Sequence, residues 1–128
     1  MSAASRGGGW RVNVSVAPAA SNRQGEHMNE PAGVVTINAK EGRADETVAL
    51  LGRIAEVASR DEGTEIYAVH RSRQDPNMIF VYELYRDKEA LKRHQANEEL
   101  RQLGAGLREL TESVDVVIGN WVAGTSPI

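Results

Sequence analysis

The strongest constraint on the fold is the run of residues 77–86, in which apolar side chains occupy both faces of an extended strand. One face carries Met78, Phe80, Tyr82 and Leu84, and the other carries Ile79, Val81, Glu83 and Tyr85. An antiparallel strand with one face in water shows an alternation of apolar and polar residues, and neither of these faces is mainly polar. Both sides of the sheet that contains this strand must therefore contact protein.

The segments before this run predict a strand, a helix and a hairpin. The short β-branched segment 34–39 predicts a strand. Apolar residues then recur at three- and four-residue spacings on one side of a helix predicted from about Arg43 to Arg60: Val48, Leu51, Ile54, Ala55 and Ala58. Residues 64–73 and 77–86 are rich in β-formers and are joined by Gln74-Asp75-Pro76, a sequence suited to a tight turn. These two runs predict a β-hairpin.

The segment after the hairpin predicts two consecutive helices and a final strand. Asp87 is a suitable N-cap for a helix whose inner stripe holds Ala90, Leu91 and His94. The leucines between residues 100 and 110 fall on the opposite side of that helical wheel, so one straight helix cannot bury both stripes. We therefore expect a break near Asn97, with Asn97 capping the second helix. An alternating apolar pattern predicts a last strand from residue 114 to about residue 121.

The order of these elements predicts the fold class. Strand, helix, hairpin, split helix and strand is the α+β, ferredoxin-like βαββαβ arrangement, with an antiparallel four-stranded sheet and helices on one face. Because the strand at 77–86 is apolar on both sides, the uncovered face needs a partner. Two copies packed sheet against sheet would bury it, so we expect a homodimer.

The chain is expected to divide into an extension, one domain and a short tail. Residues 1–32 are rich in Ala, Gly, Ser, Asn and Pro and predict a flexible extension. Within it, Trp10, Val12, Val14 and Val16 alternate with polar residues, which leaves open an extra strand near 10–16. The folded domain is expected at 33–123 and the tail at 124–128.

Composition excludes several classes of function. Fifteen Lys and Arg against eighteen Asp and Glu give a net charge of −3, which provides no electrostatic reason to bind nucleic acid. With no cysteine and three histidines, we expect neither a Cys-ligated metal site nor a His-rich metal centre. No apolar run is long enough to span a bilayer and no signal-peptide pattern is present, so we expect a cytoplasmic protein without a membrane partner.

Two stretches carry a resemblance to a known family. Gly63-Thr64-Glu65-Ile66-Tyr67 and the run from Phe80 to His94, FVYELYRDKEALKRH, resemble the antibiotic biosynthesis monooxygenase domain, over roughly residues 33–123. The resemblance implies a dimeric α+β barrel. Some members oxidise polycyclic phenols or quinols with dioxygen and use neither metal nor flavin, which implies no cofactor. The aromatic residue two positions after the motif Glu is commonly Trp in that family, and here it is Tyr85.

His94 is the candidate catalytic residue. An electron-rich phenolate can itself reduce dioxygen, so the protein need only remove a proton, exclude water and hold the substrate. An imidazole with a pKa near neutrality suits that proton transfer. The alternative is a structural His that is satisfied by a neighbouring carboxylate or carbonyl group.

Four further residues are candidates for substrate binding. Glu83 either orients a group in the pocket or forms a structural ion pair with Arg71 or Arg73. Tyr82 and Tyr85 lie on opposite faces of a regular strand, so at most one reaches a given cavity, and packing is the default role of each. Some relatives degrade haem with an Asn, an aromatic residue and a His, a set that Asn38, Tyr85 and His94 could mimic.

The sequence thus predicts a cofactor-independent monooxygenase that acts on a small aromatic or quinol-like substrate with dioxygen. The alternatives are a non-catalytic small-molecule-binding dimer, a haem-degrading monooxygenase, and an isomerase or decarboxylase that uses the same histidine. Fold alone does not decide among these reactions.

Overall fold

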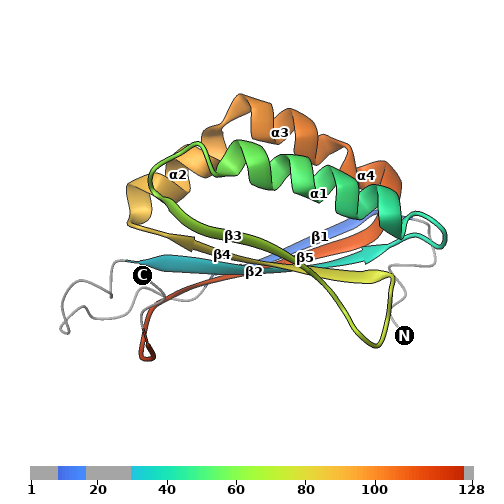
Figure 1. Ribbon diagram of the computed structural model, residues 1–128, viewed down its shortest axis with the longest axis horizontal. Helices are drawn as coiled ribbons and strands as arrows, with labels where there is room; N and C mark the ends of the chain where they lie inside the picture. The colour runs from blue at the N-terminus through green and yellow to red at the C-terminus, as the bar shows by residue number, and fades with distance from the viewer. Residues whose placement is uncertain (1–8, 17–29, 126–128) are drawn as a thin grey trace.

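The computed structural model describes residues 9–16 and 30–125, which form one sheet with helices on one side (Figure 1). The elements, in chain order, are β1 (Arg11–Val16), β2 (Pro31–Ala39), α1 (Ala44–Ala58), β3 (Thr64–Arg71), β4 (Met78–Tyr85), α2 (Lys88–Ala96), α3 (Glu98–Ala105), α4 (Leu107–Leu110) and β5 (Thr111–Asn120). From β2 onward this is the predicted α+β, ferredoxin-like order, including the helix that is broken after Ala96. The second helix was predicted to be split in two, and the structure adds a further break at Gly106, which separates α3 from α4. None of the described helices is long and apolar enough to cross a membrane.

The sheet has five strands where four were predicted. Its strand order is β1-β5-β2-β4-β3, and β2, at the centre, pairs antiparallel with both β4 and β5. The fifth strand is β1, which lies parallel to β5 at the edge of the sheet, with Val12 beside Val114. The alternating pattern near residues 10–16 left such a strand open. The rest of the extension predicted to be flexible, residues 1–8 and 17–29, and residues 126–128 of the tail lie outside the described residues.

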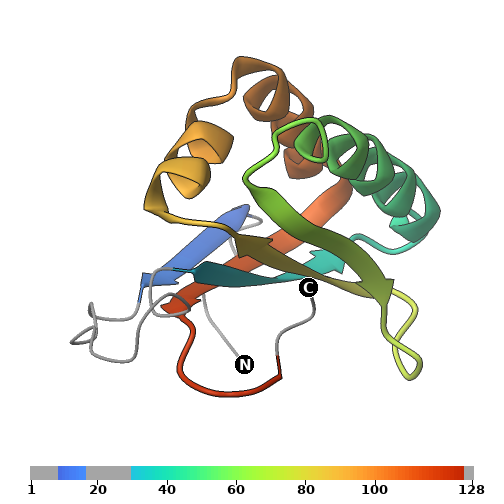
Figure 2. The same cartoon turned by 60° about the vertical axis from the view of Figure 1, so that its left-hand side comes forward.

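All described helices cover the same face of the sheet, and the core lies between them and that face (Figure 2). Ile37, Ile79 and Val81 of the central strands are fully buried there, against Leu51 and Ile54 of α1. The buried stripe of α1 differs slightly from the predicted one. Thr47, Leu50 and Val57 are buried, whereas Val48 and Ala55 are only half-buried. Helix α1 also ends at Ala58, so Arg60 does not belong to its last turn as predicted.

The predicted turn and caps are present. The Asp75 carboxylate accepts a hydrogen bond from the Asn77 backbone N–H at 3.0 Å in the β3–β4 turn. The Asp87 side chain caps α2 by accepting from Ala90 N at 2.9 Å, and the Asn97 side chain caps α3 by accepting from Leu100 N at 3.0 Å. Each cap satisfies a backbone donor that the helix itself leaves unpaired. The Asp87 cap fixes the start of α2, and the Asn97 cap lies at the break that separates α2 from α3.

Candidate functional site

Four polar side chains meet on the helix-covered face of the sheet, beside α2. Glu83 and Tyr85 alternate with Leu84 along β4, and Tyr67 of β3 lies directly across from Glu83 in the strand register. His94 of α2 lies against the two tyrosines, with its ring centroid 5.7 Å from that of Tyr67 and 5.2 Å from that of Tyr85. We call these four residues the His94 cluster.

Glu83 is the buried carboxylate of the cluster. The residue is 9% exposed and accepts a hydrogen bond of 2.5 Å from the hydroxyl of Tyr85, which is fully buried. Burial raises the pKa of Glu83, because the charged form loses its hydration, and the Tyr85 hydrogen bond partly offsets this effect. Burial and the neighbouring Glu83 also raise the pKa values of both Tyr85 and Tyr67. Both tyrosines are therefore neutral phenols here, and Tyr85 is the hydrogen-bond donor to Glu83.

His94 is held next to this carboxylate. Its Nε2 atom lies 3.9 Å from Glu83 Oε1, and its side chain is 16% exposed. Burial lowers the pKa of the imidazole, and the negative charge of Asp61 opposes that shift. The imidazole is thus kept neutral down to a lower pH than an exposed histidine, which is the state that a proton acceptor needs.

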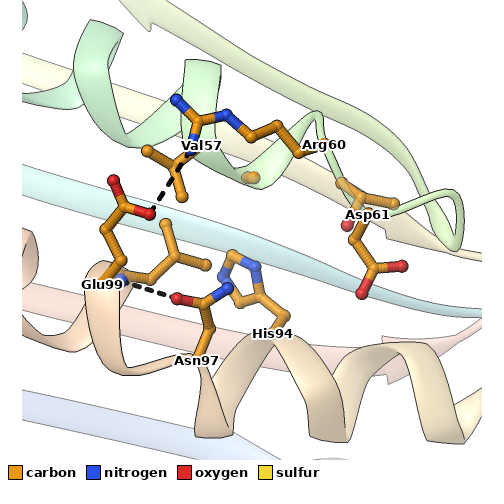
Figure 3. Close-up of a pocket in the computed structure, with 9 residues that line it drawn as sticks. Val57, Arg60, Asp61, His94, Asn97 and Glu99 are labelled. Atoms are coloured by element: carbon orange, nitrogen blue, oxygen red, sulfur yellow. Dashed lines mark hydrogen bonds and ion pairs between the residues drawn. The ribbon is translucent and has the colours of Figure 1, made fainter.

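A pocket of about 250 Å³ borders the His94 cluster, and His94 is the one member of the cluster that lines it. It lies between the end of α1, the first residue of β3 and the junction of α2 with α3, and Figure 3 shows the imidazole projecting into this region from α2. Its lining consists of Val57, Ala58, Arg60, Asp61, Thr64, His94, Asn97, Glu99 and Leu100. The residues that flank the pocket are thus both apolar and charged.

The sequence-predicted site residues are not all brought together. His94, Glu83 and Tyr85 form one cluster, whereas Tyr82 projects from the opposite face of β4. Asn38, near the end of β2, donates a hydrogen bond to the Ser113 hydroxyl at 3.1 Å. It pairs with Met78 at the far end of β4 from Glu83. The haem-degrading arrangement of Asn38, Tyr85 and His94 is therefore not formed.

Two arginines, Arg71 and Arg73, were suggested as ion-pair partners of Glu83, and Arg71 does not pair with it. Arg71 Nη1 binds Asp45 Oδ1 at 2.9 Å, and its Nε donates to the carbonyl of Pro76. Glu83 is satisfied instead by Tyr85, two residues along its own strand. Side chains two residues apart on a strand point to the same face, so the strand periodicity alone indicates that Tyr85 lies beside Glu83.

Sequence reasoning missed Tyr67 as a member of the cluster. The signal that could have found it is the hairpin register, because the short turn at Asp75 fixes which residue of β3 lies opposite Glu83. No group of three His, Asp or Glu side chains that could hold a metal ion occurs in residues 9–16 and 30–125.

Comparison with known proteins identifies the family. The sequence profile described as "Antibiotic biosynthesis monooxygenase" matches residues 33–105, which include β3, β4 and the His94 cluster. The chain belongs to the antibiotic biosynthesis monooxygenase family. No curated protein sequence is significantly similar to it.

Solved structures of similar fold span most of the chain. PA3566 from Pseudomonas aeruginosa shares 25% identity with a TM-score of 0.69, and the alignment covers 77% of this chain and 100% of that one. SO0527 from Shewanella oneidensis shares 23% identity with a TM-score of 0.71, covering 76% and 95% of the two chains. SnoaB from Streptomyces nogalater, described as a cofactor-independent oxygenase, shares 19% identity with a TM-score of 0.67, covering 77% and 97%.

Proposed function

We propose that the protein is a cofactor-independent monooxygenase that oxidises a quinol or polycyclic phenol with dioxygen, with His94 as the acid/base. The observation that carries this proposal is the neutral, mostly buried imidazole of His94, held 3.9 Å from the Glu83 carboxyl group. Membership of the family and the likeness to SnoaB support the reaction class. The cytoplasmic location remains a prediction from the sequence.

The chemistry assigned to these residues is a proton transfer that makes the substrate electron-rich. His94 Nε2 takes a proton from the substrate, and the Glu83 carboxylate, which accepts from Tyr85, stabilises the imidazolium that results. The deprotonated substrate reduces dioxygen. One oxygen atom then bonds to the substrate carbon, and the other leaves as water with the two hydrogens that the substrate has lost.

We place the substrate on the helix-covered face of the sheet beside Glu83. Gly33 pairs with Glu83 on one side and with Ile118 on the other, so no side chain of β2 stands between them. Val116 and Ile118 of β5 lie on this same face and are half-buried. An aromatic ring system is the class of ligand that suits such an apolar surface next to one proton acceptor.

We further propose that the active form is a homodimer. The face of the sheet without helices exposes three large apolar side chains, Val34, Phe80 and Val117, at 45%, 37% and 53%. The strand register places Val34 next to both Tyr82 and Val117, so these side chains form one continuous patch. A second copy packed on this patch would bury it, and both copies would contribute the same residues to the interface.

Oxygen consumption by the purified protein tests the proposed function. A panel of hydroquinones and anthrones is incubated with the full chain in air-saturated buffer, with chelator added and no flavin or metal. Consumption that is stoichiometric with product supports the proposal. One observation favours the second candidate, a non-catalytic binding dimer. The Glu83 carboxyl group already has a hydrogen-bond partner in Tyr85, which suits a structural role. This second candidate predicts that the compounds raise the melting temperature without being oxidised.

A further inference from the structure

Helix α2 carries His94 but has little buried apolar surface to hold it in place. Ala90 is the only buried residue of α2, whereas α1, on the same face of the sheet, buries seven residues. Burial of an apolar face provides most of the stability with which a helix packs in a protein. His94 lies one turn beyond Ala90, near the end of α2. Its position therefore depends on polar contacts that hold the second half of the helix.

The carboxylate of Asp61 makes these contacts from another part of the chain. Asp61 lies in the turn between α1 and β3, where its Oδ1 atom accepts a hydrogen bond of 2.8 Å from the Gly63 backbone N–H. The same carboxylate accepts hydrogen bonds from Nε and Nη2 of Arg93, at 2.9 and 3.0 Å. Arg93 directly precedes His94 on α2. A two-pronged pair of this kind fixes the relative orientation of the two side chains as well as their distance.

The pair is exposed, so its effect is on position and not on global stability. The side chains of Arg93 and Asp61 are 49% and 28% exposed. Ion pairs in contact with water contribute little to the free energy of unfolding, because solvent screens them. Two fixed hydrogen bonds can nevertheless decide where a helix with one buried residue lies. We therefore expect loss of the pair to alter the placement of His94 in a protein that is still folded.

We propose that Asp61 is a positioning residue for His94, which it holds beside Glu83 by binding Arg93 on α2. The inference rests on the proposed function for the role of His94 as the proton acceptor. With the pair formed, Nε2 of His94 lies 3.9 Å from Glu83 Oε1, and the imidazole lies against the two aromatic rings of the His94 cluster. Without the pair, the second half of α2 can move away from the sheet. The imidazole then loses the fixed position that proton transfer requires.

The charges of the pair allow position and electrostatics to be separated. The hydrogen bond from Arg93 lowers the pKa of Asp61 to about 2, so the carboxylate is ionised at neutral pH. Its negative charge raises the pKa of His94, against the larger effect of burial. The Arg93 guanidinium carries the opposite charge, so neutral substitutions at the two positions change the potential at His94 in opposite directions. A loss common to both variants therefore reports the position of the imidazole and not its charge environment.

The test measures the position of the His94 ring in the full chain by NMR and does not depend on turnover. The wild type should show nuclear Overhauser effects from the His94 ring to the rings of Tyr67 and Tyr85, whose centroids lie 5.7 and 5.2 Å away. Asp61→Asn removes the charge and one acceptor oxygen, and Arg93→Met removes the guanidinium but keeps an apolar stem. Both variants are expected to lose these effects, while urea unfolding shows that each is folded.

Two neighbouring charged residues provide the controls. Glu62→Gln removes the same charge as Asp61→Asn, from the exposed residue next in the chain. Arg60→Gln removes the ion pair of 3.4 Å that joins Arg60 to Glu99 at the start of α3 (Figure 3). Neither change alters the hydrogen bonds between the turn and α2. Both control variants should therefore retain the Overhauser effects of the wild type.

The outcomes separate this inference from the proposed function. Wild-type Overhauser effects in either folded variant, Asp61→Asn or Arg93→Met, overturn the positioning role even if the protein consumes oxygen. Unfolding of both variants also overturns it, because the pair would then determine the fold itself. Loss of the effects in both folded variants supports the role even if no compound is oxidised, in which case the proposed function fails alone.

A kinetic measurement applies where turnover is found. Asp61→Asn and Arg93→Met should each lower kcat by about ten- to a hundredfold, the cost of a misplaced reacting group. KM should not change, because neither side chain touches the substrate in this account. A merely structural role for Asp61 would leave kcat at the wild-type value in the folded variants.

Discussion

Gly63 packs directly against Ala90 of α2, and a Cβ atom at Gly63 would lie 2.4 Å from the Ala90 Cβ atom. It would also lie 2.8 Å from Nη2 of Arg93. Both residues precede His94 on the same helix, so the missing side chain at Gly63 determines how closely α2 approaches the start of β3. The position of His94 over the sheet thus depends on a glycine in another element.

We expect Gly63→Ala to destabilise the fold and to move His94. Ala90 cannot rotate its methyl group away, so the clash must displace α2, at a cost of about 1–3 kcal/mol typical of overpacking. Urea unfolding measures this loss. The control is Gly52→Ala on α1, where an added Cβ meets nothing within 4 Å. That change should stabilise the helix by about 0.5–1 kcal/mol. Unchanged stability in Gly63→Ala would contradict the close packing.

Removing the hydroxyl of Tyr85 should destabilise the protein more than the same change at Tyr82. Tyr85→Phe leaves the buried Glu83 carboxylate without its donor, at a cost of about 1–3 kcal/mol. The hydrogen bond lowers the pKa of Glu83, so Tyr85→Phe raises that pKa further. Because the bond stabilises the ionised form, the loss should be larger at alkaline than at mildly acidic pH. Equal losses in Tyr85→Phe and Tyr82→Phe, across pH, would exclude this role for the pair.

The pH dependence of turnover should show an acid limb that reports His94. A proton acceptor must be neutral, so kcat/KM should fall as the pH drops through the pKa of the imidazole. Burial lowers that pKa from the ordinary value of 6.5, so the limb is expected below pH 6.5. Steady-state rates between mildly acidic and neutral pH measure it. A limb above this value would show that another group takes the proton.

A charge on the open face of the sheet should separate the proposed dimer. Val117 is 53% exposed and lies next to Val34 in the apolar patch. Val117→Lys places a charge where two copies would meet, so sedimentation is expected to show monomers. Val122, 79% exposed and beyond the end of β5, provides the matched control, and Val122→Lys should leave the assembly unchanged. If wild type and Val117→Lys sediment alike, the open face is not the interface.

Local signals in the sequence predicted the elements better than they predicted the contacts of the site. Asp87 and Asn97 marked both helix starts, because a cap depends only on residues within the next turn. The burial of Val57 and Thr47 in α1 was missed, since the exact face of a helix that turns inward depends on the packing of the whole layer. The pairing of β1 with β5 joins segments about a hundred residues apart, and no local pattern specifies such a partner.

Only part of the candidate site was predicted, because some of its contacts depend on the fold and not on a local pattern. His94, Glu83 and Tyr85 were identified by residue type, spacing and resemblance, and the structure places them together. Tyr67 depends on the hairpin register, and Thr64 depends on the path of the chain between α1 and β3. Asn38 lies on the same strand as Gly33, which pairs with Glu83, but near the other end of that strand. A sequence pattern does not show that this separation keeps Asn38 away from Glu83.

The most direct test of the central claim compares oxygen consumption by the wild type and His94→Ala on a compound that the wild type oxidises. Circular dichroism and sedimentation show whether the variant is folded and assembled like the wild type. If His94 transfers the proton, the folded variant should lose at least about a hundredfold in kcat, as removal of a general acid/base does. A folded His94→Ala protein that consumes oxygen at the wild-type rate would contradict the account.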